Sequence, residues 1–315
     1  MMEMLQYDFM RIALVMAVLI GLTAPAVGTF IVQRRLSLLG DGIGHIALTG
    51  IGLGLLTGSS PILGALVVSV LGAVAIEVVR ARSRSGADVA LALLFYGGLA
   101  GGVILTSAAG GGASSLQSYL FGSISSVSAS DLYVVAGLAV AVLGIVALFG
   151  RELFLLCQDE EVARASGLPT RFLSILIAAV AAVTVVIAMR AIGLLLVSAL
   201  MIVPVAAAQQ LTRGFRSTML LAMGVGVLSA VSGLAGSFQY DLPPGPSIVL
   251  LALAVFVVAV AGGAVLRRRR VPAGANSDVG AGSGADVSAG GKPSPSPGPG
   301  AVRAGGEAEA EVARG

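Results

Sequence analysis

The chain has 315 residues, of which 57% are hydrophobic and only 11% are charged, and its formal net charge is +3. Soluble domains are nearer half apolar and a quarter charged, so this composition excludes an ordinary soluble protein. Long apolar runs recur from Ile12 to Leu266, and several approach the roughly 20 residues with which a helix crosses a bilayer. The sequence therefore predicts an all-α polytopic protein of the plasma membrane, surrounded by lipid and with no nucleic acid partner.

The apolar runs predict about nine spans, with eight as the alternative. The run 42–57 is short and rich in glycine, and Pro204 interrupts the run 191–211, so either could re-enter the membrane instead of crossing it. In chain order, the predicted spans are residues 11–32, 42–57, 61–79, 88–107, 131–149, 171–189, 191–211, 217–238 and 246–266.

Arginines cluster in alternate connections, as the positive-inside rule expects for cytoplasmic loops. Arg34 and Arg35 follow the first span, whereas Glu3 and Asp8 precede it. We therefore expect the N-terminus outside and the C-terminus inside.

The rest of the chain falls into a long membrane region, two structured connections and a tail. Residues 1–270 are expected to form the transmembrane domain. Residues 271–315 consist of glycine, alanine, serine, proline and scattered charge. Such a sequence cannot bury a core and predicts a disordered cytoplasmic tail. A short outside helix is expected within 114–128, and an inside helix with an acidic start, ended by Gly167, within 151–170.

Asp41 and His45 are the strongest indication of function. His45 is the one histidine of the chain. Residues four apart on a helix share a face, so a carboxylate and an imidazole could reach the same point. One interpretation is a transient site for a divalent cation, because histidine nitrogen with carboxylate oxygen suits zinc and tolerates manganese or iron. The alternative is a hydrogen bond between the two side chains.

Two ligands from each chain are too few for a closed metal site, but two chains meeting at an axis would supply four. We therefore expect a homodimer and an adjustable ion site. No permanently bound cofactor is expected, because an ion held too firmly could not leave. Asp88, at the start of the fourth predicted span, could line the same path, although capping the N-terminus of its helix is the alternative role.

Two polar segments are candidates for contact with a cytoplasmic partner. The first carries Asp159, Glu160 and Glu161 in the inside connection; a solvated loop is the alternative there. The second follows Pro204 and carries Gln209 and Arg213. It could be a helix turning along the membrane surface, or simply the end of a kinked span.

One cysteine and one lysine exclude further chemistry. Cys157 alone cannot form an internal disulfide or a cysteine-based metal cluster. Lys292 lies near the C-terminus, so the P-loop sequence GxxxxGK[ST] is absent. ATP hydrolysis would require a separate subunit, and we predict that the chain itself is not an enzyme.

Taken in order, these segments resemble the permease subunit of the ABC-type zinc/manganese importer family. The resemblance covers roughly residues 8–266. It depends on residues 34–41 with His45, 119–124, 159–163 with Gly167, 193–204 with 206–208, and 242–245. It implies a metal-binding gate at Asp41 and His45, and an ATPase-docking helix within 199–216 assisted by 159–167.

The resemblance also implies the partners: a second copy of the chain, two cytoplasmic ATPase subunits and an external metal-binding receptor. The transported ion would be zinc, with manganese or iron as alternatives. Members of the family often carry a Glu-Asp pair with a serine where this chain has Gly86-Ala87-Asp88, so the role of Asp88 is less defined. The competing hypotheses are a cobalamin or iron-siderophore type ABC permease and a proton-coupled secondary transporter.

Overall fold

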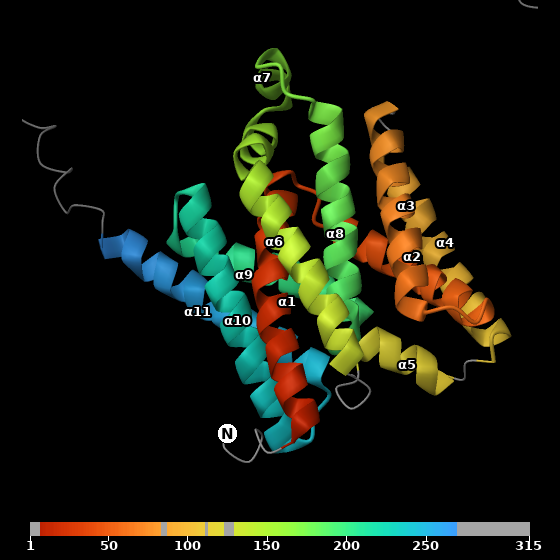
Figure 1. The fold of residues 1–315 in the computed structure, drawn as a ribbon. Helices are drawn as coiled ribbons and strands as arrows, with labels where there is room; N and C mark the ends of the chain where they lie inside the picture. The colour runs from red at the N-terminus through yellow and green to blue at the C-terminus, as the bar shows by residue number, and fades with distance from the viewer. Residues whose placement is uncertain (1–6, 83–86, 111–112, 123–128, 270–315) are drawn as a thin grey trace, which may run out of the picture. The chain divides into compact units, whose positions relative to one another are not determined.

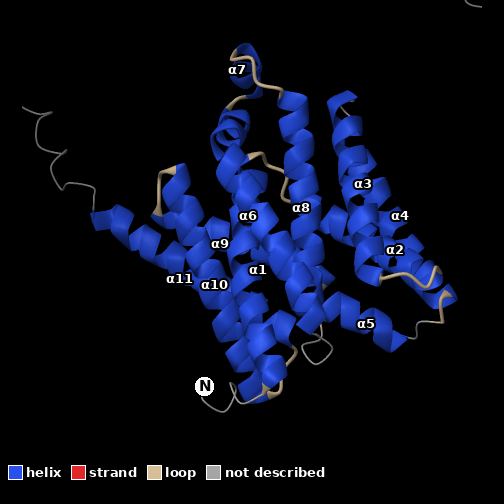
Figure 2. Ribbon diagram, viewed as in Figure 1, coloured by secondary structure: helices blue, strands red, loops and turns tan. Residues whose placement is uncertain are grey.

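The computed structural model describes residues 7–82, 87–110, 113–122 and 129–269, and all regular structure within these ranges is helical (Figure 2). Helices are expected here because a membrane offers no water to the backbone, and a helix satisfies its own amide and carbonyl groups. The tail 271–315, predicted to be disordered, lies outside the described residues.

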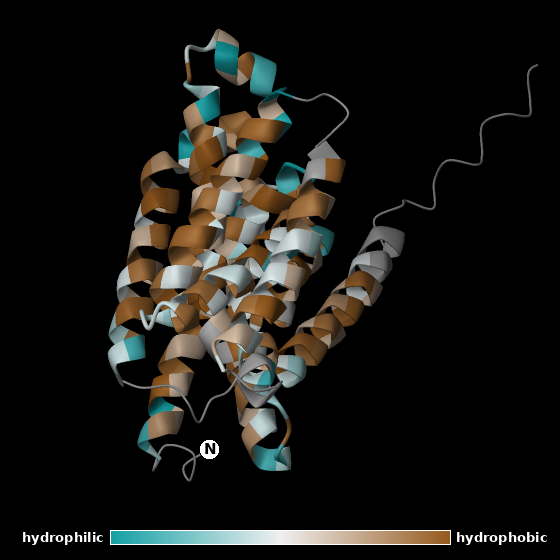
Figure 3. Cartoon of the chain, turned by 90° about the vertical axis from the view of Figure 1, so that its right-hand side faces the viewer, coloured by the Kyte–Doolittle hydropathy of each residue, from teal (hydrophilic) through white to brown (hydrophobic). Residues whose placement is uncertain are grey.

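Eight helices are long and apolar enough to cross a membrane. Figure 3 shows their apolar bodies, with hydrophilic residues gathered toward the ends. They are α1 (Asp8–Gln33), α2 (Leu39–Leu56), α3 (Pro61–Arg82), α4 (Ala87–Ala108), α6 (Ala129–Gln158), α8 (Thr170–Ile192), α10 (Phe215–Tyr240) and α11 (Pro244–Arg269). The described residues also form α5 (Ala113–Phe121), α7 (Glu160–Ala165) and α9 (Leu194–Leu211). The expected short helices in the two connections are therefore confirmed as α5 and α7.

The short helices α5 and α7 lie at opposite ends of the bundle (Figure 1). At the first, the start of α1, the end of α5 and the α10–α11 turn line one cavity; we call it the α5 end. At the second, the α1–α2 connection, the end of α6, Asp159 before α7 and the end of α9 line another; we call it the α7 end. Arg34, Arg35 and Arg80 line the α7 end. The α5 end carries Arg11, which is an exception to the clustering of arginines at the α7 end. The guanidinium of Arg11 lies 3.9 Å from the carboxylate of Asp8.

Helix α9 explains the uncertain number of spans. Gly193 precedes its first residue, and the backbone of Gly193 lies against Phe121 and Gly122 near the α5 end; the helix reaches Gln209 at the α7 end. It thus runs between the two ends, and with 18 residues it is as long as α2. The helix continues through Pro204 to Leu211.

Of the two alternatives for the segment after Pro204, the structure shows the end of a bundle helix, which continues to Leu211, and not a helix turning along the membrane surface. Thr212 after α9 and Gly214 before α10 are both extended. They join two bundle helices through a short connection, and no separate surface helix lies between them.

Helix α2 lies between α3, α4 and α9 and packs most extensively against α4. The two helices run parallel. Gly42 lies against Leu91, the Thr49 hydroxyl donates to the Gly98 carbonyl at 2.7 Å, and Gly52 lies against Leu105. Small residues allow such close approach between membrane helices. This packing fixes the position of α2 along α4 and the side of α2 that faces α4.

Candidate metal site

Asp41 lies in the first turn of α2 and is half-buried, and His45 follows one turn later with 8% of its surface exposed. Residues four apart lie on one face of the helix, and the two side chains are near enough for their charges to interact. The structure thus places the carboxylate and the imidazole on the same side of α2.

The ring of His45 is held by α4. Its centroid lies 4.1 Å from that of Phe95, with the ring planes at 65°. Gly98 also packs on this turn, because a Cβ added there would lie 2.8 Å from the carbonyl carbon of His45. The imidazole is therefore positioned by a neighbouring helix as well as by its own.

The Nδ1 atom of His45 is buried and has no hydrogen-bond partner. Buried polar atoms in proteins are almost always paired, so such an atom calls for a partner. The hydrogen bond to Asp41 that we considered as an alternative is not formed at this nitrogen. An unpaired nitrogen beside a carboxylate fits a metal-ligand role.

Within the described residues, no cluster of three or more His, Cys, Asp or Glu side chains could hold a metal ion. One chain therefore offers the pair Asp41 and His45 alone. The side chain of Asp88 is not described. The parallel register of α2 and α4 places its backbone one turn before Leu91, which packs on Gly42 beside Asp41.

The acidic segment at the α7 end is built as a capped helix. The carboxylate of Asp159 accepts from the amides of Glu161 at 2.8 Å and Val162 at 3.1 Å, which caps the N-terminus of α7. Gly167 has φ of 79°, and the following amide of Leu168 donates to Ala163, as in a Schellman motif. The predicted acidic start and glycine end are confirmed.

The remaining predicted docking residues divide into exposed and buried. Gln209 and Arg213 are exposed at and after the end of α9, and Glu160 and Glu161 are exposed on α7. Asp159, Glu160 and Gln209 line one cavity of about 660 Å³. Pro204 is buried inside α9 and does not belong to this surface.

Burial of Arg34 was not predicted from the sequence. The positive charge of Arg34 indicated only a cytoplasmic loop. Its side chain is 6% exposed and lies 3.7 Å from the Glu160 carboxylate. Burial lowers the pKa of Arg34, nearby Arg80 lowers it further, and Glu77 and Glu160 oppose this shift. Glu77 itself forms a two-point ion pair with Arg80, at 2.7 and 3.0 Å.

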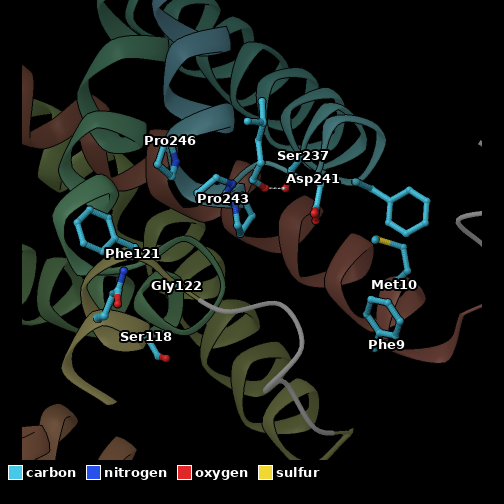
Figure 4. Close-up of a pocket in the computed structure, with 13 residues that line it drawn as sticks. Phe9, Met10, Ser118, Phe121, Gly122, Ser237, Asp241, Pro243 and Pro246 are labelled. Atoms are coloured by element: carbon cyan, nitrogen blue, oxygen red, sulfur yellow. Dashed lines mark hydrogen bonds between the residues drawn. The ribbon is translucent and has the colours of Figure 1, made fainter. Parts of the chain in front are cut away.

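The cavity at the α5 end has a volume of about 840 Å³ (Figure 4). Phe9 and Met10 come from α1, Phe121 from α5, and Pro243 from the α10–α11 turn. Asp241 ends α10 with φ of 53°, and the Ser237 hydroxyl donates to the carbonyl of Leu242. The lining is thus mainly apolar, on a rigid turn.

An all-helical bundle with many spans and an ionisable pair on an inner helix defines a multi-pass membrane transport protein. The model of the ABC 3 transport family matches residues 6–263. The chain belongs to this family, and the resemblance seen in the sequence, to permease subunits of ABC-type metal importers, is confirmed.

Three similar proteins carry informative names. The manganese transport system membrane protein MntC of Halalkalibacterium halodurans is 35% identical over 82% of this chain and 88% of its own length. The manganese import system permease protein ScaB of Streptococcus gordonii is 32% identical over 80% and 91%. PsaBC from Streptococcus pneumoniae in complex with Fab gives a TM-score of 0.77 at 30% identity, covering 85% of this chain and 97% of that one.

Proposed function

We propose that this chain is the permease subunit of an ATP-driven importer of a divalent metal, in which Asp41 and His45 hold the ion during transport. The observation that carries the proposal is the buried, unpaired Nδ1 of His45 one turn from the half-buried Asp41. Ionisable groups within a membrane segment are costly and usually mark an ion path.

The names of the relatives favour manganese over the zinc expected from the sequence. The ligand chemistry accommodates both, since a carboxylate and an imidazole bind either ion. Two ligands per chain support a site shared between two copies, each contributing Asp41 and His45. Asp88 is proposed to line the same path because the helix register places its backbone about one turn from the level of Gly42, which follows Asp41.

The two ends of the bundle suit two different partners. The α7 end, with exposed Asp159, Glu160, Glu161, Gln209 and Arg213, is proposed to face the cytoplasm and to dock the ATPase subunits. The arginines there support this orientation. The α5 end, with its apolar cavity beside Asp241, is proposed to face outward and to receive the metal-binding receptor.

Metal quantification in cells tests the proposal. Cells lacking the chain are complemented with the natural sequence, with Asp41→Ala plus His45→Ala, or with Thr57→Ala, which changes an exposed hydroxyl at the far end of the same helix. We expect restored manganese with the natural sequence and the control, and none with the double variant. Uptake by the double variant at normal membrane expression would refute the role of the pair. Deleting the ATPase in the same cells separates this mechanism from proton-coupled transport.

Cross-linking tests the shared site separately. Because Cys157 is the one cysteine of the chain, an Asp41→Cys variant in a Cys157→Ser background carries a single thiol. Two copies that meet at α2 will form a disulfide-linked dimer on mild oxidation. Thr57→Cys in the same background is the control for random collision.

A further inference from the structure

Arg34 joins three helices at the α7 end. It follows the last residue of α1. Its Nη1 donates to the hydroxyl of Ser174 on α8 at 3.0 Å, and its Nη2 lies 3.7 Å from the carboxylate of Glu160 on α7. Arg164 contacts the same carboxylate at 3.2 Å from within α7, but its side chain is 67% exposed. Arg34 is thus the buried partner of Glu160, and Arg164 the solvated one.

A buried charge constrains its neighbours more strongly than an exposed one. Removing the partner of a buried ion leaves an uncompensated charge, whereas a surface pair contributes little. The Glu160 side chain is 48% exposed, so water screens its attraction to Arg34, but the contact still joins α7 to the end of α1. Displacement of α7 is therefore expected to move Arg34.

The connection from Arg34 to α2 is short and hydrogen-bonded. Arg35 adopts φ of 58°, and the amide of Leu36 donates to Ile31 at 3.0 Å, which closes the end of α1. The amide of Leu39, the first residue of α2, then donates to the carbonyl of Leu36 at 2.9 Å. No flexible linker separates Arg34 from the first turn of α2, in which Asp41 lies.

We propose that Arg34 is a positioning residue that transmits movement of α7 to α2, and so couples the ATPase to the ion site. The proposal rests on the function proposed above. Arg34 is proposed to act through its contact with Glu160, since only 6% of its side chain is exposed and it offers little surface of its own to a partner.

The test compares ATP hydrolysis with manganese uptake by the complete transporter, reconstituted with its ATPase subunits in lipid vesicles. In Arg34→Ala we expect hydrolysis within about twofold of the natural level and uptake lowered by roughly tenfold or more. Arg34→Lys keeps the charge but loses the fork of donors, and is expected to recover part of the uptake. Arg151→Ala, which removes an exposed arginine of α6, is the control and is expected to leave the ratio of uptake to hydrolysis unchanged.

Two further variants keep the proposal refutable if Arg34→Ala does not reach the membrane. Glu160→Gln is expected to lower the ratio of uptake to hydrolysis in the same way. Arg34→Glu combined with Glu160→Arg restores the opposite charges and is expected to recover uptake above either single variant. Unchanged uptake in Arg34→Ala or Glu160→Gln would overturn the proposal. So would an equal fall of hydrolysis and uptake, which indicates lost assembly.

The double variant Asp41→Ala with His45→Ala, measured in the same vesicles, distinguishes the two proposals. If the double variant abolishes uptake while Arg34→Ala keeps natural hydrolysis and uptake, the ion-site proposal is supported and the coupling role of Arg34 is refuted. If it transports normally while Arg34→Ala uncouples hydrolysis from uptake, the ion-site proposal fails instead.

Discussion

The imidazole of His45 packs edge-on against the ring of Phe95, with the ring centroids 4.1 Å apart. The contact joins α2 to α4 at the proposed ion site, and it fixes the direction of a side chain whose Nδ1 has no hydrogen-bond partner. Phe95 is therefore expected to affect how well the ligands are oriented, although it cannot bind a metal itself.

Phe95→Leu tests this orientation. Leucine keeps the site apolar but removes the ring contact, which is worth about 0.5–1.5 kcal/mol. If that energy orients His45, the apparent KM for manganese uptake rises by roughly two- to tenfold. Tyr133→Leu, at an exposed ring on α6, is the control and is expected to leave KM unchanged. An unaltered KM in Phe95→Leu would show that His45 is held by other contacts.

Adjacent glycines on α4 provide a matched pair for the close packing of α2. A Cβ on Gly98 would lie 2.8 Å from the backbone of His45, whereas a Cβ on Gly97 would have no atom within 4 Å. Gly98→Ala is expected to destabilise the protein by about 1–3 kcal/mol through overpacking. Gly97→Ala is expected to be neutral or stabilising by up to about 1 kcal/mol, because alanine favours the helix. Thermal unfolding in detergent measures both, and equal midpoints would contradict the parallel α2–α4 packing.

Asp159 caps α7 by accepting two backbone amides. Asp159→Ala is expected to destabilise the N-terminus of this helix by about 1 kcal/mol. Hydrogen exchange of the Glu161 and Val162 amides should then accelerate, while Asp159→Asn, which keeps a capping oxygen, remains close to the natural rate. Equal protection in the alanine variant would mean that α7 is held by its packing alone.

Hydropathy was sufficient to predict most of the bundle, because crossing helices must be apolar over a fixed length. It placed α6 too short: the predicted span stopped at residue 149, whereas the helix continues to Gln158. Arg151 and Glu152 end the apolar run but not the helical hydrogen bonding, so the helix extends beyond the hydrophobic region.

The sequence predicted separate spans at 171–189 and 191–211, but not the backbone conformation that separates α8 from α9. Gly193 adopts φ of 92° and ψ of 151°, a conformation that favours glycine, and its backbone lies against Phe121 and Gly122. That contact joins segments far apart in the sequence, so no local pattern indicates it.

The pair proposed as the ion site could be singled out from the sequence, whereas the residue proposed to control it could not. Asp41 and His45 stand out because ionisable residues are rare in apolar sequence. Arg34 follows the first predicted span and has the charge of an ordinary cytoplasmic loop. The Arg34 side chain contacts Ser174 and Glu160. Both residues are far from Arg34 in the sequence, so only the folded chain shows these contacts.

Equilibrium binding of Mn²⁺ to the purified permease tests the central claim most directly. Free and bound metal are separated by dialysis and quantified for the natural protein, for Asp41→Ala with His45→Ala, and for Thr57→Ala. The account predicts binding by the natural protein and by Thr57→Ala, and a Kd raised by roughly tenfold or more in the double variant. An unchanged Kd and stoichiometry in the double variant would contradict it.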